Sequence, residues 1–295
     1  TSETGYTLKV ATSGDAGALV NKLVLTKDAP LGDAVFGIDN TYATRALDQG
    51  VIDTSATVTL PKGAESYVVA DTPALAPIDV GDVCLNIDTG YFSGKGLKPP
   101  ATFEDLTKPE YKGLLVAINP TNSSPGMAWL LATIGHFGAS SFADYWKQLA
   151  AGGARIAEDW TAAYETDFSG GGKGTYPIVV SYASSPSFTV SDDGASSSTS
   201  ALLDTAFRQV EYAGVLKGAA NPEGGKAFVT WMLSKAVQED IPGQMYMYPV
   251  LPDAALPEAL TKFGPLSSAP VSVEPKEITA HREEWLNTWT GAVGK

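Results

Sequence analysis

The sequence contains one cysteine and two histidines in 295 residues, which is little material for a disulfide framework or a metal centre. Cys84 has no second cysteine to pair with, and the apolar residues around it predict a buried thiol on a strand. His136 and His281 stand far apart in helix-like segments, and neither belongs to a zinc-binding spacing. We therefore expect no disulfide, no histidine-based metal site and no cofactor.

No stretch of about 18 consecutive apolar residues occurs, so the sequence offers no candidate membrane-spanning helix. Its first five residues, Thr1 to Gly5, lack the basic and apolar regions of a signal peptide. A trimmed exported protein would begin in this way, and so would a cytosolic protein.

Basic residues are also scarce: 20 lysines and arginines stand against 33 acidic residues, for a net charge of −13. This balance argues against nucleic acid as a partner, because phosphates require a basic patch. It permits attraction of cationic solutes, although an acidic solvated surface that keeps the protein soluble explains the charge equally well.

Sequence motifs of common enzymes are missing as well. There is no Gly-x-Ser-x-Gly elbow and no Gly-x-Gly-x-x-Gly after a strand, and Gly170-Gly171-Gly172-Lys173-Gly174 lacks the spacing of a phosphate-binding loop. We expect a protein that captures a ligand and is not an enzyme.

Apolar strand-like runs alternate with amphipathic helical windows, which is typical of α/β architecture, and the length favours two lobes. Polar, glycine-rich stretches at 170–172 and 191–200 predict loops. The expected strands are Tyr6–Ala11, Asp33–Ile38, Leu114–Ile118 and Ile178–Tyr182, and the expected helices are Ala16–Thr26, Thr41–Gln49, Pro125–His136, Ser140–Ala150, Asp159–Phe168, Pro222–Ser234 and Lys276–Thr290.

Two positions combine a helix start with side chains suited to a ligand. Ser123 or Ser124 is expected at an N-cap with Pro125 at the first helical position, where free amides and the helix dipole favour an anion. Asp15 is expected to cap the helix that begins at Ala16. Simple capping accounts for each of them without any ligand.

Three aromatic residues, Trp160, Tyr182 and Tyr246, are expected before a helix, at a strand end and in a loop, where side chains can face a cleft. Each alone suits a core position, because aromatic residues dominate cores. As a set they suggest stacking against a cation, at about 0.5 to 2 kcal/mol per contact.

Six segments of the chain match one family, in order and at compatible spacing: Gly37–Asn40, Asn119–Gly126, Asp159-Trp160 with Tyr164, Ser181–Pro186, Gln209–Leu216 and Tyr246–Val250. Through these segments the chain resembles the solute-binding proteins of thiamine ABC transporters nearly end to end. The resemblance implies a type II periplasmic-binding-protein fold of two α/β lobes, with lobe one formed by 1–77 plus 215–295 and lobe two by 78–214. Pro77–Gly81 and Gln209–Gly214 would form the hinge.

The resemblance also implies a function: a monomer outside the cytoplasmic membrane, periplasmic, extracellular or lipid-anchored, captures thiamine or a thiamine phosphate by lobe closure. It would deliver this ligand to the membrane subunits of an ABC permease. The residues implied to bind the ligand are Asp15, Ser123, Ser124, Trp160, Tyr164, Tyr182 and Tyr246. Ser123 would hold phosphate and Asp15 the aminopyrimidine, whereas Tyr246 stands where the family has tryptophan and would stack more weakly.

The sequence departs from the family at one place, because the family has another strand, an aromatic contact and a helix before the point where this sequence begins. We expect a fragment of a longer protein, or a strand supplied from elsewhere. Two alternatives remain open: a carrier of iron or another small solute on the same fold, and an enzyme of thiamine metabolism sharing it. The paired tyrosines typical of iron carriers are absent from the sequence.

Overall fold

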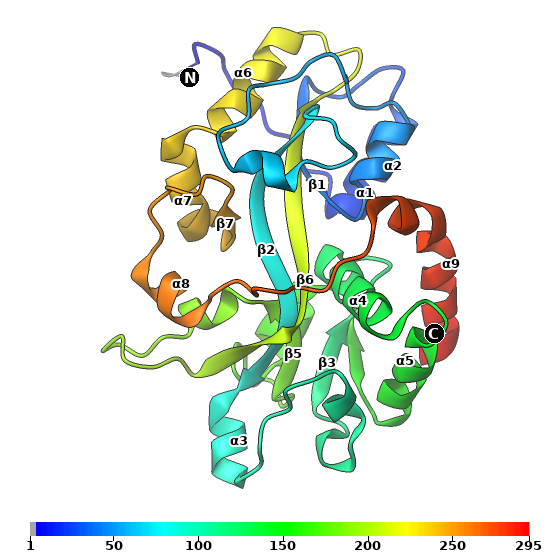
Figure 1. Cartoon of the computed structure of the whole chain (residues 1–295), viewed down its shortest axis with the longest axis vertical. Helices are drawn as coiled ribbons and strands as arrows, with labels where there is room; N and C mark the ends of the chain where they lie inside the picture. Colours follow the sequence, from blue (N-terminus) through cyan, green and yellow to red (C-terminus); the bar gives the residue numbers. More distant parts are fainter. Residues whose placement is uncertain (1–3, 295) are drawn as a thin grey trace. The chain divides into compact units, whose positions relative to one another are not determined.

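A computed structural model describes residues 4–294, and the chain divides into two compact units, each drawn in Figure 1. Unit 1 comprises Thr1–Val80 and Gln209–Leu256, and unit 2 comprises Gly81–Arg208 and Pro257–Lys295. The predicted division assigns the segment that begins at Pro257 to lobe one, whereas the structure packs this segment in unit 2.

The sheet of unit 1 is built around the second half of β6, which has β1 on one side and β2 on the other. Strand β1 runs antiparallel to β6, with Asp39 opposite Glu211, and β2 pairs with β7 through Asp79 and Pro249. Helices α1 and α6 pack against β1. The elements of unit 1 in chain order are α1 (Ala16–Leu25), β1 (Ala34–Asp39), α2 (Ala43–Asp48), a 3₁₀ turn (Ala64–Tyr67), the start of β2 (Leu75–Asp88), the end of β6 (Thr199–Val215), α6 (Pro222–Met232), α7 (Lys235–Met245) and β7 (Tyr248–Pro249).

The sheet of unit 2 continues from β2 through β5 and β3 to β4. Strand β5 is antiparallel to β2, whereas β5, β3 and β4 run parallel to one another. The elements of unit 2 in chain order are the end of β2, α3 (Thr89–Lys95), 3₁₀ turns at Glu104–Thr107 and Pro109–Tyr111, β3 (Leu115–Ile118), α4 (Ser124–Phe137), α5 (Phe142–Ala151), β4 (Arg155–Ala157), a π-helical turn (Ala162–Asp167), β5 (Ile178–Tyr182), a 3₁₀ turn (Ser185–Phe188), the start of β6, α8 (Glu258–Phe263) and α9 (Pro275–Val293).

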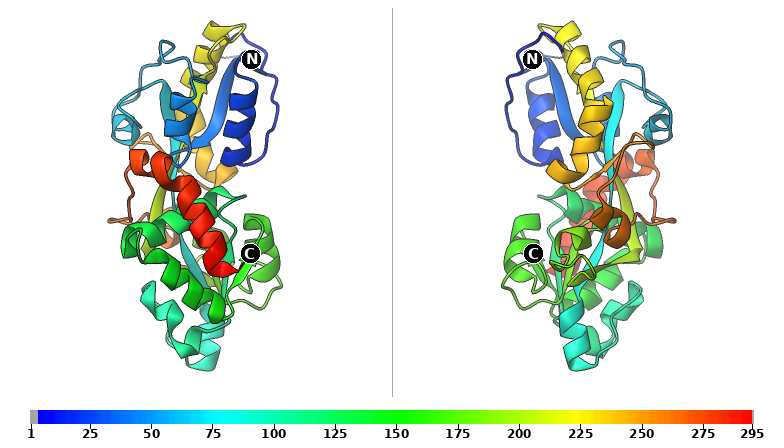
Figure 2. Two further views of the ribbon diagram at one scale, coloured as in Figure 1. Left: turned by 90° about the vertical axis from the view of Figure 1, so that its right-hand side faces the viewer. Right: turned by 90° about the vertical axis from the view of Figure 1, so that its left-hand side faces the viewer.

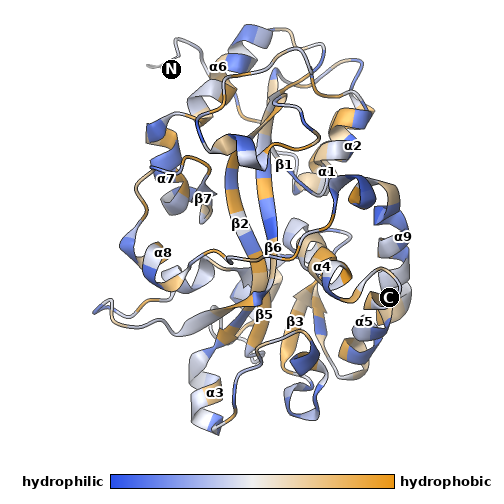
Figure 3. Ribbon diagram, in the orientation of Figure 1, coloured by the Kyte–Doolittle hydropathy of each residue, from blue (hydrophilic) through white to orange (hydrophobic). Residues whose placement is uncertain are grey.

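Helix α4 is the interior helix of unit 2, because every residue from Ser124 to Ile134 is buried. Its Trp129 meets Trp146 of α5 edge to face at 5.1 Å, and Trp146 meets Trp289 of α9 at 5.6 Å between ring centroids. Such pairs contribute about 0.5 to 1.5 kcal/mol beyond the area they bury. Figure 2 shows the red α9 alongside α5, and Figure 3 colours β3 as hydrophobic throughout. This aromatic contact explains why the C-terminal helix belongs to unit 2.

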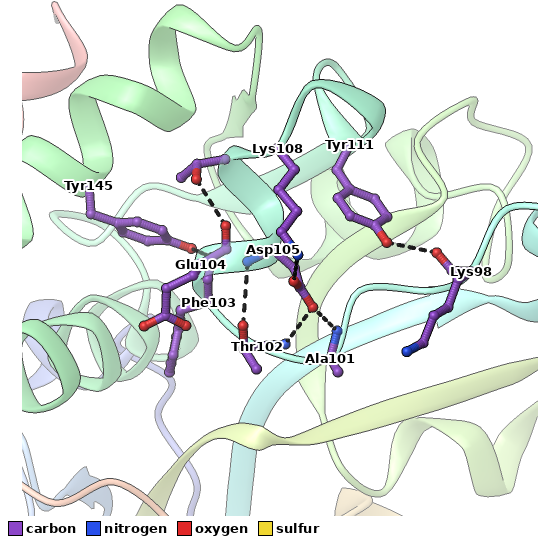
Figure 4. Close-up of polar contacts among 10 residues, drawn as sticks. Lys98, Ala101, Thr102, Phe103, Glu104, Asp105, Lys108, Tyr111 and Tyr145 are labelled. Atoms are coloured by element: carbon purple, nitrogen blue, oxygen red, sulfur yellow. Dashed lines mark hydrogen bonds and ion pairs between the residues drawn. The ribbon is translucent and has the colours of Figure 1, made fainter.

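The loop before β3 has no long helix or strand and is held by side-chain bonds to backbone, shown in Figure 4. The Asp105 carboxylate accepts from the backbone amides of Ala101 and Thr102, at 2.8 and 3.2 Å, and pairs with Lys108. The hydroxyl of Tyr145 donates to the Phe103 carbonyl at 2.9 Å. The Lys108 ammonium, helped by the two amides, lowers the pKa of Asp105 to about 2.

Most predicted elements are confirmed, with β5 at the predicted bounds and Cys84 fully buried on β2. The predicted strand Tyr6–Ala11 is wrong: these residues are irregular and exposed, and no described strand pairs with them. The predicted helix Asp159–Phe168 is mostly a π-helical turn. Between residues 4 and 294, the structure contains no helix long and apolar enough to cross a membrane.

Candidate functional site

The start of α4 in unit 2 is the predicted anion site. Ser123 is the N-cap, with extended backbone angles, and its hydroxyl accepts from the Gly126 amide at 3.5 Å. Ser124 is therefore the first helical residue and Pro125 the second, one position later than predicted. A side chain on Gly126 would place its Cβ 2.7 Å from the Asn119 carbonyl oxygen. Glycine thus lets the helix start lie directly against the end of β3.

The loop before α4 carries its own polar network. The Asn119 side chain accepts from the Thr121 backbone amide at 3.0 Å. The side-chain amide of Asn122 donates to the Glu158 carboxylate at 2.9 Å. The Asn119 backbone amide donates to the Ala157 carbonyl at 2.8 Å, so the ends of β3 and β4 are joined. The Glu158 carboxylate is therefore bound to the loop that leads into α4, through Asn119 and Asn122.

The aromatic residues predicted for unit 2 form a preassembled group. The rings of Trp160 and Tyr164 stack with centroids 4.9 Å apart and planes 10° apart. The Trp160 indole nitrogen donates to the Ser181 hydroxyl at 2.9 Å, and that hydroxyl lies 2.8 Å from the Ser185 hydroxyl. Burial raises the pKa of Tyr164, against hydrogen bonds from Ser185 and Thr199 that lower it. The stack is therefore tied to the end of β5.

The parallel order of β5, β3 and β4 brings the predicted ligand-binding residues of unit 2 to one edge of the sheet. Tyr182 ends β5, Ser123 follows β3 by one short loop, and Trp160 lies three residues after β4 ends at Ala157. These strands are adjacent and parallel, so their carboxyl ends meet at the same sheet edge. Ligands of open α/β sheets bind at this edge.

The other two predicted residues, Asp15 and Tyr246, belong to unit 1. The Asp15 side chain accepts from the Ala16 amide at 2.8 Å and caps α1, as predicted, and it is exposed to solvent. Tyr246 ends α7 with φ +61° and is 53% exposed. A left-handed backbone is unusual for tyrosine and costs about 1 kcal/mol.

Sequence reasoning missed a row of acidic side chains in unit 1. Asp39, Glu211 and Asp79 lie on the adjacent strands β1, β6 and β2. Asp39 and Asp79 are fully buried, and Glu211 is half-buried. An acidic residue inside an apolar strand, as in Pro77-Ile78-Asp79-Val80, was the available signal.

Burial and mutual repulsion change the protonation of this row. Burial, and then the negative charge of Asp39, raise the pKa of Glu211 to about 7. Burial, and then the nearby Glu211, raise the pKa of Asp79 well above its ordinary value. Asp39 accepts from the amide and hydroxyl of Thr41, at 2.9 and 2.6 Å.

Another buried acid, Asp82 in unit 2, is paired with an arginine. Its carboxylate accepts from both the Nε and a terminal nitrogen of Arg208, and from the Ser267 amide at 2.6 Å. Arg208 also donates to the Ser267 carbonyl at 2.9 Å. This network ties the segment before α9 to β2 and β6.

Two surface grooves lie away from the predicted residues. A groove of 460 Å³ in unit 1 is lined by Trp231, Ala236, Val237, Glu239 and Asp240. A groove of 280 Å³ in unit 2 lies beside α4 and α5, with Glu104, Phe137 and Tyr145 among its lining residues. Within the described part of the chain, no three histidine, cysteine or acidic residues are placed to hold a metal ion.

Comparison with known proteins gives consistent matches across the chain. The family described as bacterial extracellular solute-binding protein matches residues 33–263. The thiamine-binding periplasmic proteins of Escherichia coli and Salmonella typhimurium are 27% and 26% identical, each over 98% of this chain and 84% of the relative.

Solved structures show the same fold. A periplasmic thiamin binding protein superposes with a TM-score of 0.81 at 24% identity, over 96% of this chain and 85% of that one. Iron-bound HitA from Pseudomonas aeruginosa gives 0.77 at 19% identity, over 99% and 92%. AfuA from Actinobacillus pleuropneumoniae, with fructose-6-phosphate bound, gives 0.76 at 17% identity, over 95% and 88%.

Proposed function

The chain belongs to the family of bacterial extracellular solute-binding proteins, and we propose that its solute is thiamine or a thiamine phosphate. Its fold is the type II periplasmic-binding-protein fold, shared with solved binding proteins of several solutes. The full-length similarity to relatives named as thiamine-binding supports the choice of solute. The protein would work in the periplasm or outside the cell, as a monomer that delivers thiamine to an ABC permease without converting it.

One observation carries the proposal: three adjacent parallel strands of unit 2 end at Tyr182, near Ser123 and near Trp160. Thiamine combines a positively charged aromatic ring with a hydroxyethyl arm that can carry phosphate. The Trp160 and Tyr164 rings suit the cationic ring, because a cation over an aromatic face gains about 0.5 to 2 kcal/mol. The start of α4 suits the phosphate.

Unit 1, considered by itself, carries the exposed Asp15 carboxylate, whose negative charge attracts a cation. The aminopyrimidine ring of thiamine is rich in donors, which a carboxylate such as Asp15 accepts well.

The stacked aromatic pair favours an organic cation over a bare metal ion or a sugar phosphate. Structural similarity to HitA and AfuA shows the fold alone, because their sequences are less than 20% identical to this chain. The start of α4 would serve any phosphate, so the aromatic pair is the discriminating feature.

Titration calorimetry with a panel of compounds tests the proposal. Thiamine and thiamine monophosphate should bind, whereas thiochrome, the neutral oxidised form of thiamine, should bind at least tenfold more weakly because it lacks the cation. Fructose-6-phosphate and ferric ion serve as controls. Binding of a control compound with no binding of any thiamine compound would refute the proposal.

A further inference from the structure

The glycine run at residues 170–174 of unit 2, Gly-Gly-Gly-Lys-Gly, packs against the turn that carries the aromatic pair. None of its glycines has a positive φ, so the backbone conformation does not require glycine there. A Cβ on Gly172 would lie 2.6 Å from the backbone carbonyl carbon of Glu165, and a Cβ on Gly174 would strike the end of the same turn. Glycine stands at these positions because the run lies directly on the π-helical turn Ala162–Asp167.

Gly171 is the member of this run that meets an aromatic ring. A Cβ on Gly171 would lie 2.7 Å from Cδ1 and 2.9 Å from Cζ of Tyr164, and closer still to Cε1. The Tyr164 side chain is buried, whereas Gly171 is exposed to solvent, so the glycine backbone covers the ring from outside. A side chain at position 171 would therefore have to displace either the ring or the loop.

The Tyr164 ring is also the partner of the Trp160 indole, at 4.9 Å between centroids and 10° between planes. The indole is fixed separately, because its nitrogen donates to the Ser181 hydroxyl at 2.9 Å. That hydroxyl lies 2.8 Å from the Ser185 hydroxyl at the end of β5. One member of the pair is thus held by hydroxyl groups and the other by the Gly171 backbone.

We propose that Gly171 is a positioning residue: its bare backbone sets the orientation of the Tyr164 ring and, through the stack, that of the Trp160 indole. The inference rests on the proposed function in one respect, that this pair receives the cationic ring of the solute. Attraction between a cation and an aromatic ring requires the cation to lie over the ring face, so a tilted indole binds more weakly. Gly171 acts on the solute through Tyr164.

Gly171→Ala adds the carbon atom for which the Tyr164 ring leaves no room. Calorimetry should show thiamine affinity lowered about fivefold, and Gly171→Val should lower it further because the larger side chain displaces the ring more. Gly94→Ala is the matched control in α3 of the same unit, where a Cβ would meet no atom within 4 Å, and it should keep the wild-type affinity. Equal affinity of Gly171→Ala and wild type would overturn the proposal, because the loop would then have moved in place of the ring.

A measurement without ligand tests the contact with the ring. Near-ultraviolet circular dichroism reports the fixed packing of aromatic side chains, so Gly171→Ala should change this spectrum and Gly94→Ala should not. In a protein that already carries Tyr164→Ala, adding Gly171→Ala should change nothing further, because the two changes act through the same ring.

The ligand-free spectra also separate this inference from the proposed function. An unchanged spectrum of Gly171→Ala, or a change that persists after Tyr164→Ala, overturns the proposal. If the spectra behave as expected but the wild-type protein binds no thiamine compound, the proposed function and the link to a solute both fail, while the contact between Gly171 and the Tyr164 ring stands.

Discussion

Trp160 and Tyr164 stack face to face with their ring centroids 4.9 Å apart, and Tyr164 lies in the π-helical turn Ala162–Asp167 that follows Trp160. Tyr164 covers one face of the indole, and the indole nitrogen is held by Ser181. Trp160 is only partly buried, so part of its indole stays accessible to solvent. The pair is thus rigid before any solute arrives, which lowers the entropy lost on binding.

Replacing the indole should therefore weaken binding strongly. Trp160→Ala should reduce thiamine affinity more than tenfold, because a desolvated cation over an indole gains about 2 kcal/mol. Trp231→Ala, in the surface groove of unit 1, is the matched control and should leave affinity unchanged. Calorimetry that finds equal affinity for Trp160→Ala and wild type would remove Trp160 from the site. Tyr182→Phe should cost less, since its ring face remains.

The anion site is tested by Ser123→Ala. Loss of the cap should cost about 1 kcal/mol of stability, and affinity for thiamine monophosphate should fall more than affinity for thiamine. Ser141, which precedes α5 without a capping bond, gives the control variant Ser141→Ala. Equal losses for the two ligands would mean that Ser123 serves only as a helix cap.

The buried ion pair between Arg208 and Asp82 in unit 2 should stabilise the fold, and we expect it to have no direct role in ligand binding. Among the described residues, Arg208→Met leaves the buried Asp82 carboxylate with the Ser267 amide as its remaining donor, which should lower stability by about 3 to 5 kcal/mol. The double variant Arg208→Met with Asp82→Leu should recover part of that loss. Denaturant unfolding measures both, and a single variant as stable as the wild type would contradict the account.

The contacts of Asp105 in the loop before β3 predict that the stability of the protein falls at acidic pH. The pKa of this carboxyl is lowered, so its stabilising contribution is complete above about pH 4 and disappears as pH falls towards 2. Because the group lies near solvent, we expect only about 1 kcal/mol from it. Asp105→Asn should remove this part of the acid dependence, as followed by thermal unfolding between pH 2 and 5. An unchanged acid profile would show that the loop is held by its other contacts.

Regular elements were predictable from the sequence where periodicity and local signals agreed. Strand β5 was predicted at its observed bounds because a short apolar run ends in Ser181 and Tyr182. The π-helical turn Ala162–Asp167 was not predictable, because the spacing of its apolar residues does not distinguish it from an α-helix. Tyr6 to Ala11 alternates like a strand, but alternation alone cannot supply a strand to pair with.

Long-range contacts limited the prediction of the site. The sequence placed Ser123, Trp160 and Tyr182 near element ends, and the parallel order of three strands then brought those ends to one edge. The acidic row escaped notice because Asp39, Asp79 and Glu211 meet only through strand pairing. Residues so far apart in sequence carry no local signature of their contact.

Native mass spectrometry of the protein, purified from cells without added ligand, tests the central claim most directly. If the solute is thiamine, part of the protein should carry the added mass of one thiamine or thiamine phosphate, and Trp160→Ala should lose that species. A retained iron ion or sugar phosphate in its place, with no thiamine compound bound even after incubation with thiamine, would contradict the account.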